Sequence, residues 1–93
     1  MRQIAVKHSF AYNGARLNVF HANKGEGLVM HKHEYSHAIM CNSGLCKVSL
    51  ENGKSIVMDK NTQPVNLIAG VLHEIEAIEN NTVFVNVFAE GKQ

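Results

Sequence analysis

Apolar residues along this chain recur mainly at every second position, in short runs that turn-forming residues interrupt about every ten residues. A period of two is typical of β-strands with one buried face, and turns at this spacing are typical of sandwiches and barrels. Helical periodicity is nearly absent. The pattern predicts strands at Gln3–Lys7, Ala15–Phe20, Gly27–His33, His37–Cys41, Leu45–Leu50, Ser55–Met58, Val65–Ile68, Val71–Ile78 and Val83–Phe88.

Two of the turns predict which strands are neighbours. Asn52-Gly53 lies between two alternating runs, and Asn-Gly is a strong hairpin signal because a type I′ turn needs positive φ at both central residues. The turn at residues 42–44 predicts a further hairpin, so residues 37–58 would form a three-strand meander. Many short strands in so small a chain leave many open edges, which closure of the sheet removes. We therefore expect an all-β fold, a small antiparallel β-barrel or double-sheet jelly roll, as one domain over residues 1–93.

Composition limits the functions to consider. The 93 residues carry a formal net charge of +1, and the nine lysines and arginines are scattered, so a phosphate-binding stripe is absent and we expect no nucleic-acid partner. No apolar run resembles a signal peptide or spans a bilayer, so we expect a cytoplasmic protein without a membrane partner. The two cysteines, Cys41 and Cys46, are too few for a secreted disulfide scaffold. We expect core thiols there, with a labile cross-strand disulfide as the alternative.

Histidines supply the candidate chemistry. His31 and His33 stand two apart and so share one face of a strand, and His37 follows after a short bend. His73 lies on the same inward, apolar face of its predicted strand as Ile75. A buried imidazole at such a position needs a partner. Neutral imidazole is a common transition-metal ligand. These residues predict a site for one divalent ion of iron, manganese, nickel, copper or zinc, among which the ligand type does not choose.

The segment around these histidines resembles the first motif of the cupin family. That motif reads Gly, five residues, His-x-His, three or four residues, Glu, six residues, Gly, and its positions are held here by Gly25, His31, His33, His37 and Gly44. One position departs from the family, since His37 stands where the motif has glutamate.

The second cupin motif is matched in part. Gly70 and His73 fit it, whereas Thr62, Ile68 and Ala77 stand where the family has glycine, proline and asparagine. The resemblance covers about residues 25–77 and implies a cupin fold with His31, His33, His37 and His73 as metal ligands. Four neutral ligands would leave the full dipositive charge on the ion, which makes a bound water or substrate more acidic.

The resemblance also implies the function that we expect. A metal-dependent enzyme acting on a small oxygen-rich molecule is the first expectation, with dioxygenase-type oxidoreductase chemistry ahead of lyase or isomerase chemistry. Tyr35, between two of the predicted ligands, is a candidate catalytic donor, although a simple loop aromatic is the alternative. A non-catalytic module that binds a small ligand or a metal, as a sensor or storage protein, remains the competing function.

Residues 33–37 also spell His-Glu-x-x-His, the signature of zinc proteases. In those enzymes a helix places both histidines on one face, and the glutamate, here Glu34, acts as the base. The flanking residues favour strands and no helical pattern follows, so the protease remains a remote alternative.

The last predicted strand is apolar on both faces. Phe84 and Phe88 alternate with Val83, Val85 and Val87, which suggests a second buried surface and therefore a homodimer. Two further histidines, His8 and His21, match neither motif, and we expect them at the surface or at an interface.

Overall fold

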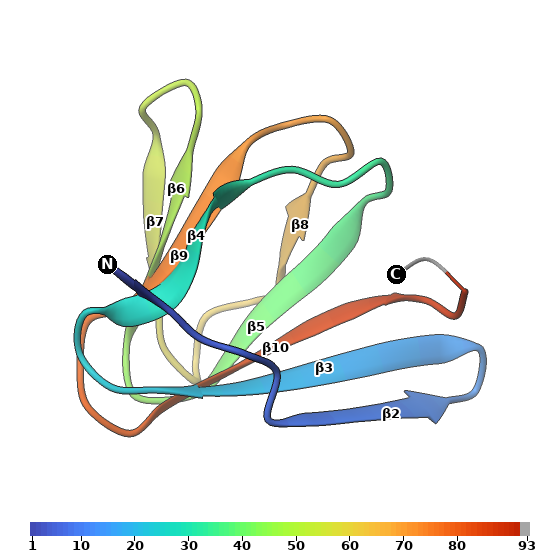
Figure 1. Cartoon of the computed structure of the whole chain (residues 1–93), viewed down its shortest axis with the longest axis horizontal. Helices are drawn as coiled ribbons and strands as arrows, with labels where there is room; N and C mark the ends of the chain where they lie inside the picture. Colours follow the sequence, from blue (N-terminus) through green and yellow to red (C-terminus); the bar gives the residue numbers. More distant parts are fainter. Residues whose placement is uncertain (92–93) are drawn as a thin grey trace.

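The computed structural model describes residues 1–91 of the chain, so the last two residues of the predicted domain, 92–93, lie outside the described residues (Figure 1). Every helix or strand element in that range is a strand, which confirms the expected all-β class. The strands are β1 (Arg2–Gln3), β2 (His8–Tyr12), β3 (Ala15–Ala22), β4 (Glu26–His31), β5 (His37–Ser43), β6 (Cys46–Leu50), β7 (Ser55–Met58), β8 (Val65–Leu67), β9 (His73–Ala77) and β10 (Thr82–Ala89). No stretch within residues 1–91 forms a helix of the length and apolarity that crossing a bilayer requires.

The strands form two five-stranded sheets that face each other (Figure 1). One sheet has the order β1-β4-β9-β6-β7 and the other the order β2-β3-β10-β5-β8. All strand pairs are antiparallel except β1 with β4. The inner faces of both sheets supply one apolar core, which includes Phe20, Leu28, Ile39, Val48, Met58, Leu67, Ile75 and Phe84. This arrangement is the double-sheet jelly roll that the alternating pattern predicts.

The first predicted strand is wrong. Residues 3–7 are not one strand, because Gln3 ends β1, residues 4–7 form a connection, and the next strand, β2, belongs to the other sheet. All five side chains of β2 are exposed, so no contrast between buried and exposed positions marks this edge strand in the sequence. Its pairing with β3 is set instead by the turn at Asn13 and Gly14, whose φ angles of 51° and 85° are those of a type I′ hairpin.

The hairpin at Asn52-Gly53 is confirmed, but its turn type differs from the prediction. Strands β6 and β7 pair antiparallel with Ser49 opposite Ser55. Gly53 has a φ of 88°, whereas Asn52 has a negative φ. The N–H of Gly53 donates to the Leu50 carbonyl at 3.0 Å. The backbone N–H of Lys54 donates to the Asn52 side-chain oxygen at 2.9 Å. The loop is therefore a three-residue connection that ends in a left-handed glycine.

The predicted three-strand meander is also wrong. Strands β5 and β6 do not pair, because the turn at residues 42–44 carries the chain from one sheet to the other. Gly44, with a φ of 75°, packs against the fully buried Thr82, whose hydroxyl bonds both backbone groups of Leu45 at 3.3 Å. The turn residues predicted the reversal correctly. The destination of each strand depends on pairing with β9 and β10, which lie far along the chain.

Cys41 and Cys46 are buried free thiols on β5 and β6, which confirms the expectation of core thiols. Burial raises the pKa of both, that of Cys46 to about 12. Since the thiolate is the reactive form, we expect neither to react with Ellman's reagent at pH 8 in the folded protein, and both to react in guanidinium chloride. Labelling of either thiol in the native protein at the rate of a free cysteine would contradict this burial.

Candidate metal centre

A bulge in β4 places His31 beside His73. Leu28 and His31 on β4 pair with Ile75 and His73 on β9, so three steps along one strand match two along the other. The extra residue lies within residues 29–30, which are exposed, whereas Leu28 is buried and His31 lies beside the buried His73. Bulges of this kind redirect side chains near functional sites. Strict alternation could not turn Leu28 and His31 to the same side, and the strand predicted to reach residue 33 ends at His31.

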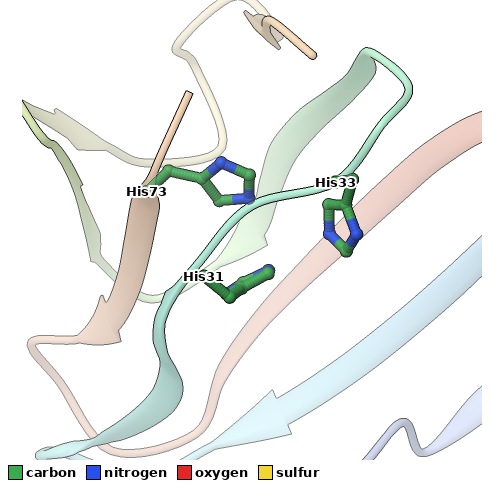
Figure 2. A group of neighbouring side chains, drawn as sticks. All are labelled: His31, His33 and His73. Atoms are coloured by element: carbon green, nitrogen blue, oxygen red, sulfur yellow. The ribbon is translucent and has the colours of Figure 1, made fainter. Parts of the chain in front are cut away.

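Three of the four predicted ligands form a cluster. The ligand nitrogens of His31, His33 and His73 all lie within 4.8 Å of one another. Figure 2 shows the three imidazoles directed toward a common space, one from the end of β4, one from the segment after it and one from β9. Nitrogens bound at about 2.1 Å to one tetrahedral ion stand roughly 3.4 Å apart, so a contraction of up to about 1.4 Å would complete the geometry.

Backbone carbonyls orient two of these rings. The Nδ1 of His31 lies 2.7 Å from the Val29 oxygen, and that of His73 lies 3.1 Å from the Val71 oxygen. A carbonyl only accepts, so each Nδ1 carries the proton and each Nε2 keeps its lone pair. The Nε2 of His73 is buried without a partner. Such a nitrogen is costly in an apolar interior, and a bound cation would satisfy it.

His37, the fourth predicted ligand, lies next to the cluster. This residue begins β5 and is 3% exposed, and its ring centroid is 5.1 Å from that of His33 and 5.2 Å from that of His73. Its Nε2 is also buried without a partner, while its Nδ1 lies 3.5 Å from the Ala38 carbonyl oxygen. The structure therefore clusters the ligand nitrogens of three histidines and places the ring of His37 at the edge of this cluster.

The environment favours the neutral form of His33, His37 and His73. Burial is the main cause that lowers the pKa of His37 to about 4; the Ala38 carbonyl opposes the shift, and the neighbouring histidines add to it. Burial also lowers the pKa of His33 and His73, again with smaller contributions from nearby histidines. Neutral imidazole is the form that binds a metal ion, so at neutral pH these side chains need no deprotonation before ligation.

A cavity of about 270 Å³ lies over the histidines. His31, His33 and His37 line one part of it. Tyr35 also lines it, with its ring stacked on His33 at a centroid distance of 4.9 Å and a tilt of 25°. Burial raises the pKa of Tyr35, so its hydroxyl stays protonated at neutral pH. Tyr35 is thus placed where a bound molecule can contact it.

The structure also shows polar lining residues that sequence reasoning missed. Asn18 on β3 and Asn86 on β10 line the same cavity. Asn86 is 6% exposed and occupies an inward position between Phe84 and Phe88. A single asparagine on the inner face of an otherwise apolar strand was the signal that could have identified it, since buried polar groups require a partner.

The zinc-protease alternative is excluded by the local backbone. Residues 32–36 connect β4 to β5 as an irregular bend and contain no helix, so the histidines at 33 and 37 do not share a helical face. Glu34 is exposed to solvent.

The fold is that of the cupins, also described as a double-stranded β-helix. A cupin 2 domain-containing protein from Halorhodospira halophila superposes with a TM-score of 0.77 at 16% identity, over 92% of this chain and 64% of that one. A cupin-2 domain protein from Shewanella frigidimarina gives 0.73 at 11% identity, over 94% and 84%. KdgF from Halomonas sp. gives 0.76 at 18% identity, over 88% and 74%. No family model matches the sequence, and no curated protein is significantly similar to it.

Proposed function

From this cupin fold and the histidine cluster, we propose that the protein binds one divalent transition metal ion and uses it to hold a small oxygen-rich molecule in the cavity. His31, His33 and His73 supply three ligands and His37 the fourth. The observation that carries the proposal is the pair of buried Nε2 atoms, on His37 and His73, that have no protein partner. Iron, manganese, nickel, copper and zinc all accept imidazole nitrogen.

The proposal is tested by metal content and metal titration. Protein purified without a histidine tag, stripped with a chelator and titrated with cobalt(II) or zinc(II), should bind one ion per chain with micromolar or tighter affinity. The cobalt complex should show a visible absorption spectrum of nitrogen coordination. Protein that binds no more metal than the metal-stripped His31→Ala/His73→Ala variant would overturn the proposal.

His37 has a separate expected effect. Because its ring lies beside the three-histidine cluster, His37→Ala should weaken cobalt binding by roughly tenfold and leave the ion more open to water. His37→Glu restores a ligand with negative charge, so binding should return while the acidity of the bound water falls. Titration and the cobalt spectrum measure both. Unchanged affinity and spectrum in His37→Ala would remove His37 from the ligand set.

We further propose that the metal protein is an enzyme, with dioxygenase-type oxidoreductase chemistry first and lyase or isomerase chemistry second. A redox-active ion would supply electron transfer, and any of these ions would supply Lewis acidity. The chain's own contribution is clearer. Leu28, Phe20 and Phe88 line the cavity and exclude water, and the protonated Tyr35 hydroxyl can donate to a bound substrate.

One observation favours the non-catalytic alternative. The cavity lining within residues 1–91 includes no carboxylate, lysine or arginine, so the ligand histidines and Tyr35 are the only groups there that could move a proton. A screen of the metal-loaded protein against diketones, phenolics, thiols and sugar acids separates the two functions. Turnover of one class supports the enzyme, whereas tight binding without turnover supports a sensor or storage module.

We also propose a homodimer through the outer face of sheet β2-β3-β10-β5-β8. Val19, Val85 and Met40 lie side by side on three adjacent strands, and Leu17 and Val87 stand next to them. At the edge of this face, Phe10 is 48% exposed. Val85 is 4% exposed and the other four are half-buried, so the face is a continuous apolar surface on the outside of the sheet, as interfaces between copies often are. His8 on the edge strand β2 and His21 on its neighbour β3 are exposed, with ring centroids 5.9 Å apart.

A charge on this face should separate the dimer. In Val19→Lys an ammonium group replaces an apolar contact, so we expect a dimer to become a monomer by sedimentation velocity. Val57→Lys places the same charge on β7, where Val57 is 55% exposed on the other sheet, and should leave the dimer intact. A wild-type protein that sediments as a monomer would contradict the proposed homodimer.

A further inference from the structure

Asn86 lines the cavity with a carboxamide whose oxygen is buried and unsatisfied. Its side chain is 94% buried, since 6% is exposed, and its Oδ1 has no hydrogen-bond partner in the protein. Asn86 belongs to the sheet that faces the one carrying His31 and His73, and it lines the same cavity as His31 and His33. A molecule that fills the cavity from the metal side therefore meets this carboxamide. A buried acceptor without a partner is costly, and a ligand can supply that partner.

Asn18 is held next to Asn86 with one of its groups already used. The two residues are Cα partners across β3 and β10, and both line the cavity. The Oδ1 of Asn18 accepts from the Ser9 hydroxyl at 2.6 Å, and the Ser9 oxygen accepts from Arg16 at 3.1 Å. Arg16 in turn makes two contacts to Glu90, at 2.9 and 3.0 Å. The group that Asn18 offers to a ligand is therefore its amide N–H.

The charge and size of the cavity limit the chemical class of the ligand further. Its lining includes no lysine, arginine or carboxylate among the described residues, and the Arg16 charge outside it is offset by Glu90. A charged group at the asparagine end would be buried without a counter-ion, which is strongly unfavourable. A hydroxyl both donates and accepts, so it can accept from the Asn18 amide and donate to the Asn86 oxygen when a half-turn of the carboxamide brings that buried oxygen to the cavity surface. The 270 Å³ volume lies below the roughly 300–1,000 Å³ of drug-sized sites.

We propose that Asn86, assisted by Asn18, is a specificity-determining residue that binds a neutral hydroxyl at the end of the substrate opposite to its metal-binding oxygens. The substrate class is then a small, polar molecule that chelates the ion at one end and carries an uncharged alcohol at the other. This inference rests on the proposed metal function. Any anionic charge on the substrate belongs at the metal end, where the ion balances it.

A pair of chelators that differ in one hydroxyl tests the assignment. Kojic acid is a hydroxypyranone that binds divalent metals through its ketone and ring hydroxyl oxygens and carries a hydroxymethyl group across the ring. Allomaltol has a methyl group in that place. On the cobalt-loaded protein, kojic acid should bind roughly tenfold more tightly than allomaltol, because its alcohol satisfies the carboxamides.

The matched variants are Asn86→Leu, which keeps the number and branching of the side-chain heavy atoms, and Asn86→Ala, which leaves space. Both should bind cobalt as the wild type does, and both should bind the two chelators equally. Asn66→Leu makes the same change at an exposed position on β8 and should keep the tenfold preference. Equal binding of both chelators by the wild type, or a preference that survives in Asn86→Leu, overturns only the role of Asn86 in binding a hydroxyl. Protein that takes up no cobalt overturns both the proposed metal function and the role of Asn86.

Thermal unfolding supplies a readout that a structural role would not give. Since the Asn86 oxygen is buried without a partner, Asn86→Leu should raise the melting temperature of the metal-free protein by roughly 4 °C or more while it abolishes the hydroxyl preference. Gain of stability with loss of binding is the expected mark of a residue kept for its ligand. A lower melting temperature together with weaker binding of allomaltol would identify Asn86 as structural and overturn the proposal.

Discussion

Replacing His73 with alanine is expected to abolish metal binding, with an affinity at least roughly 100-fold weaker than that of the wild type. His73 is the one cluster member on β9, and its Nε2 is buried without a protein partner. The three remaining ligands all come from residues 31–37, and two of them, His31 and His33, are more exposed than His73. Cobalt titration measures the loss directly.

The stability of the protein should report the same loss. An ion that binds only the folded state at a hundred times its dissociation constant stabilises it by about 2.7 kcal/mol, which for a domain of this size raises the melting temperature by roughly 10 °C or more. The wild type should show this rise when cobalt is added, and His73→Ala should not. His21→Ala, which removes an exposed histidine of the distant His8–His21 pair, is the control and should keep the full rise. Undiminished metal content in His73→Ala would contradict the proposal that the histidine cluster binds the ion.

Local alternation was a good predictor of strands and a poor predictor of their neighbours. Apart from the N-terminal segment, each predicted strand is present with ends that shift by at most two residues. The period of two reflects burial on one face, which is a local property of the chain. The meander failed because β5 and β6 are separated by pairing with β10 and β9, and no turn residue records which sheet receives a strand.

The histidines could be predicted because metal binding needs particular side chains at particular spacings, and these are visible in the sequence. Two features of the site were not visible. The bulge at residues 29–30 depends on the register between β4 and β9, which joins residues more than 40 positions apart. The cavity wall formed by Asn18 and Asn86 depends on the pairing of β3 with β10, whose partner residues lie even further apart along the chain.

The register that places His31 beside His73 requires close contact of two backbones, and Gly27 is the residue that permits it. A Cβ at this position would overlap the Ile75 carbonyl oxygen and stand 3.0 Å from the Cα of Glu76. These are backbone atoms of a central strand, which cannot turn aside as the end of a side chain can. We therefore expect Gly27→Ala to push β4 away from β9.

The expected cost of Gly27→Ala is about 2–4 kcal/mol of unfolding free energy, as for other strained insertions into packed regions. Since the same strand pair carries His31 and His73, cobalt affinity should fall by at least roughly tenfold as well. Gly53→Ala is the matched control. Gly53 has a φ of 88° and open space around it, so alanine there should cost only about 1–2 kcal/mol of backbone strain and leave metal affinity unchanged. Equal metal affinity in the two variants would show that the approach of β4 to β9 does not position the ligands.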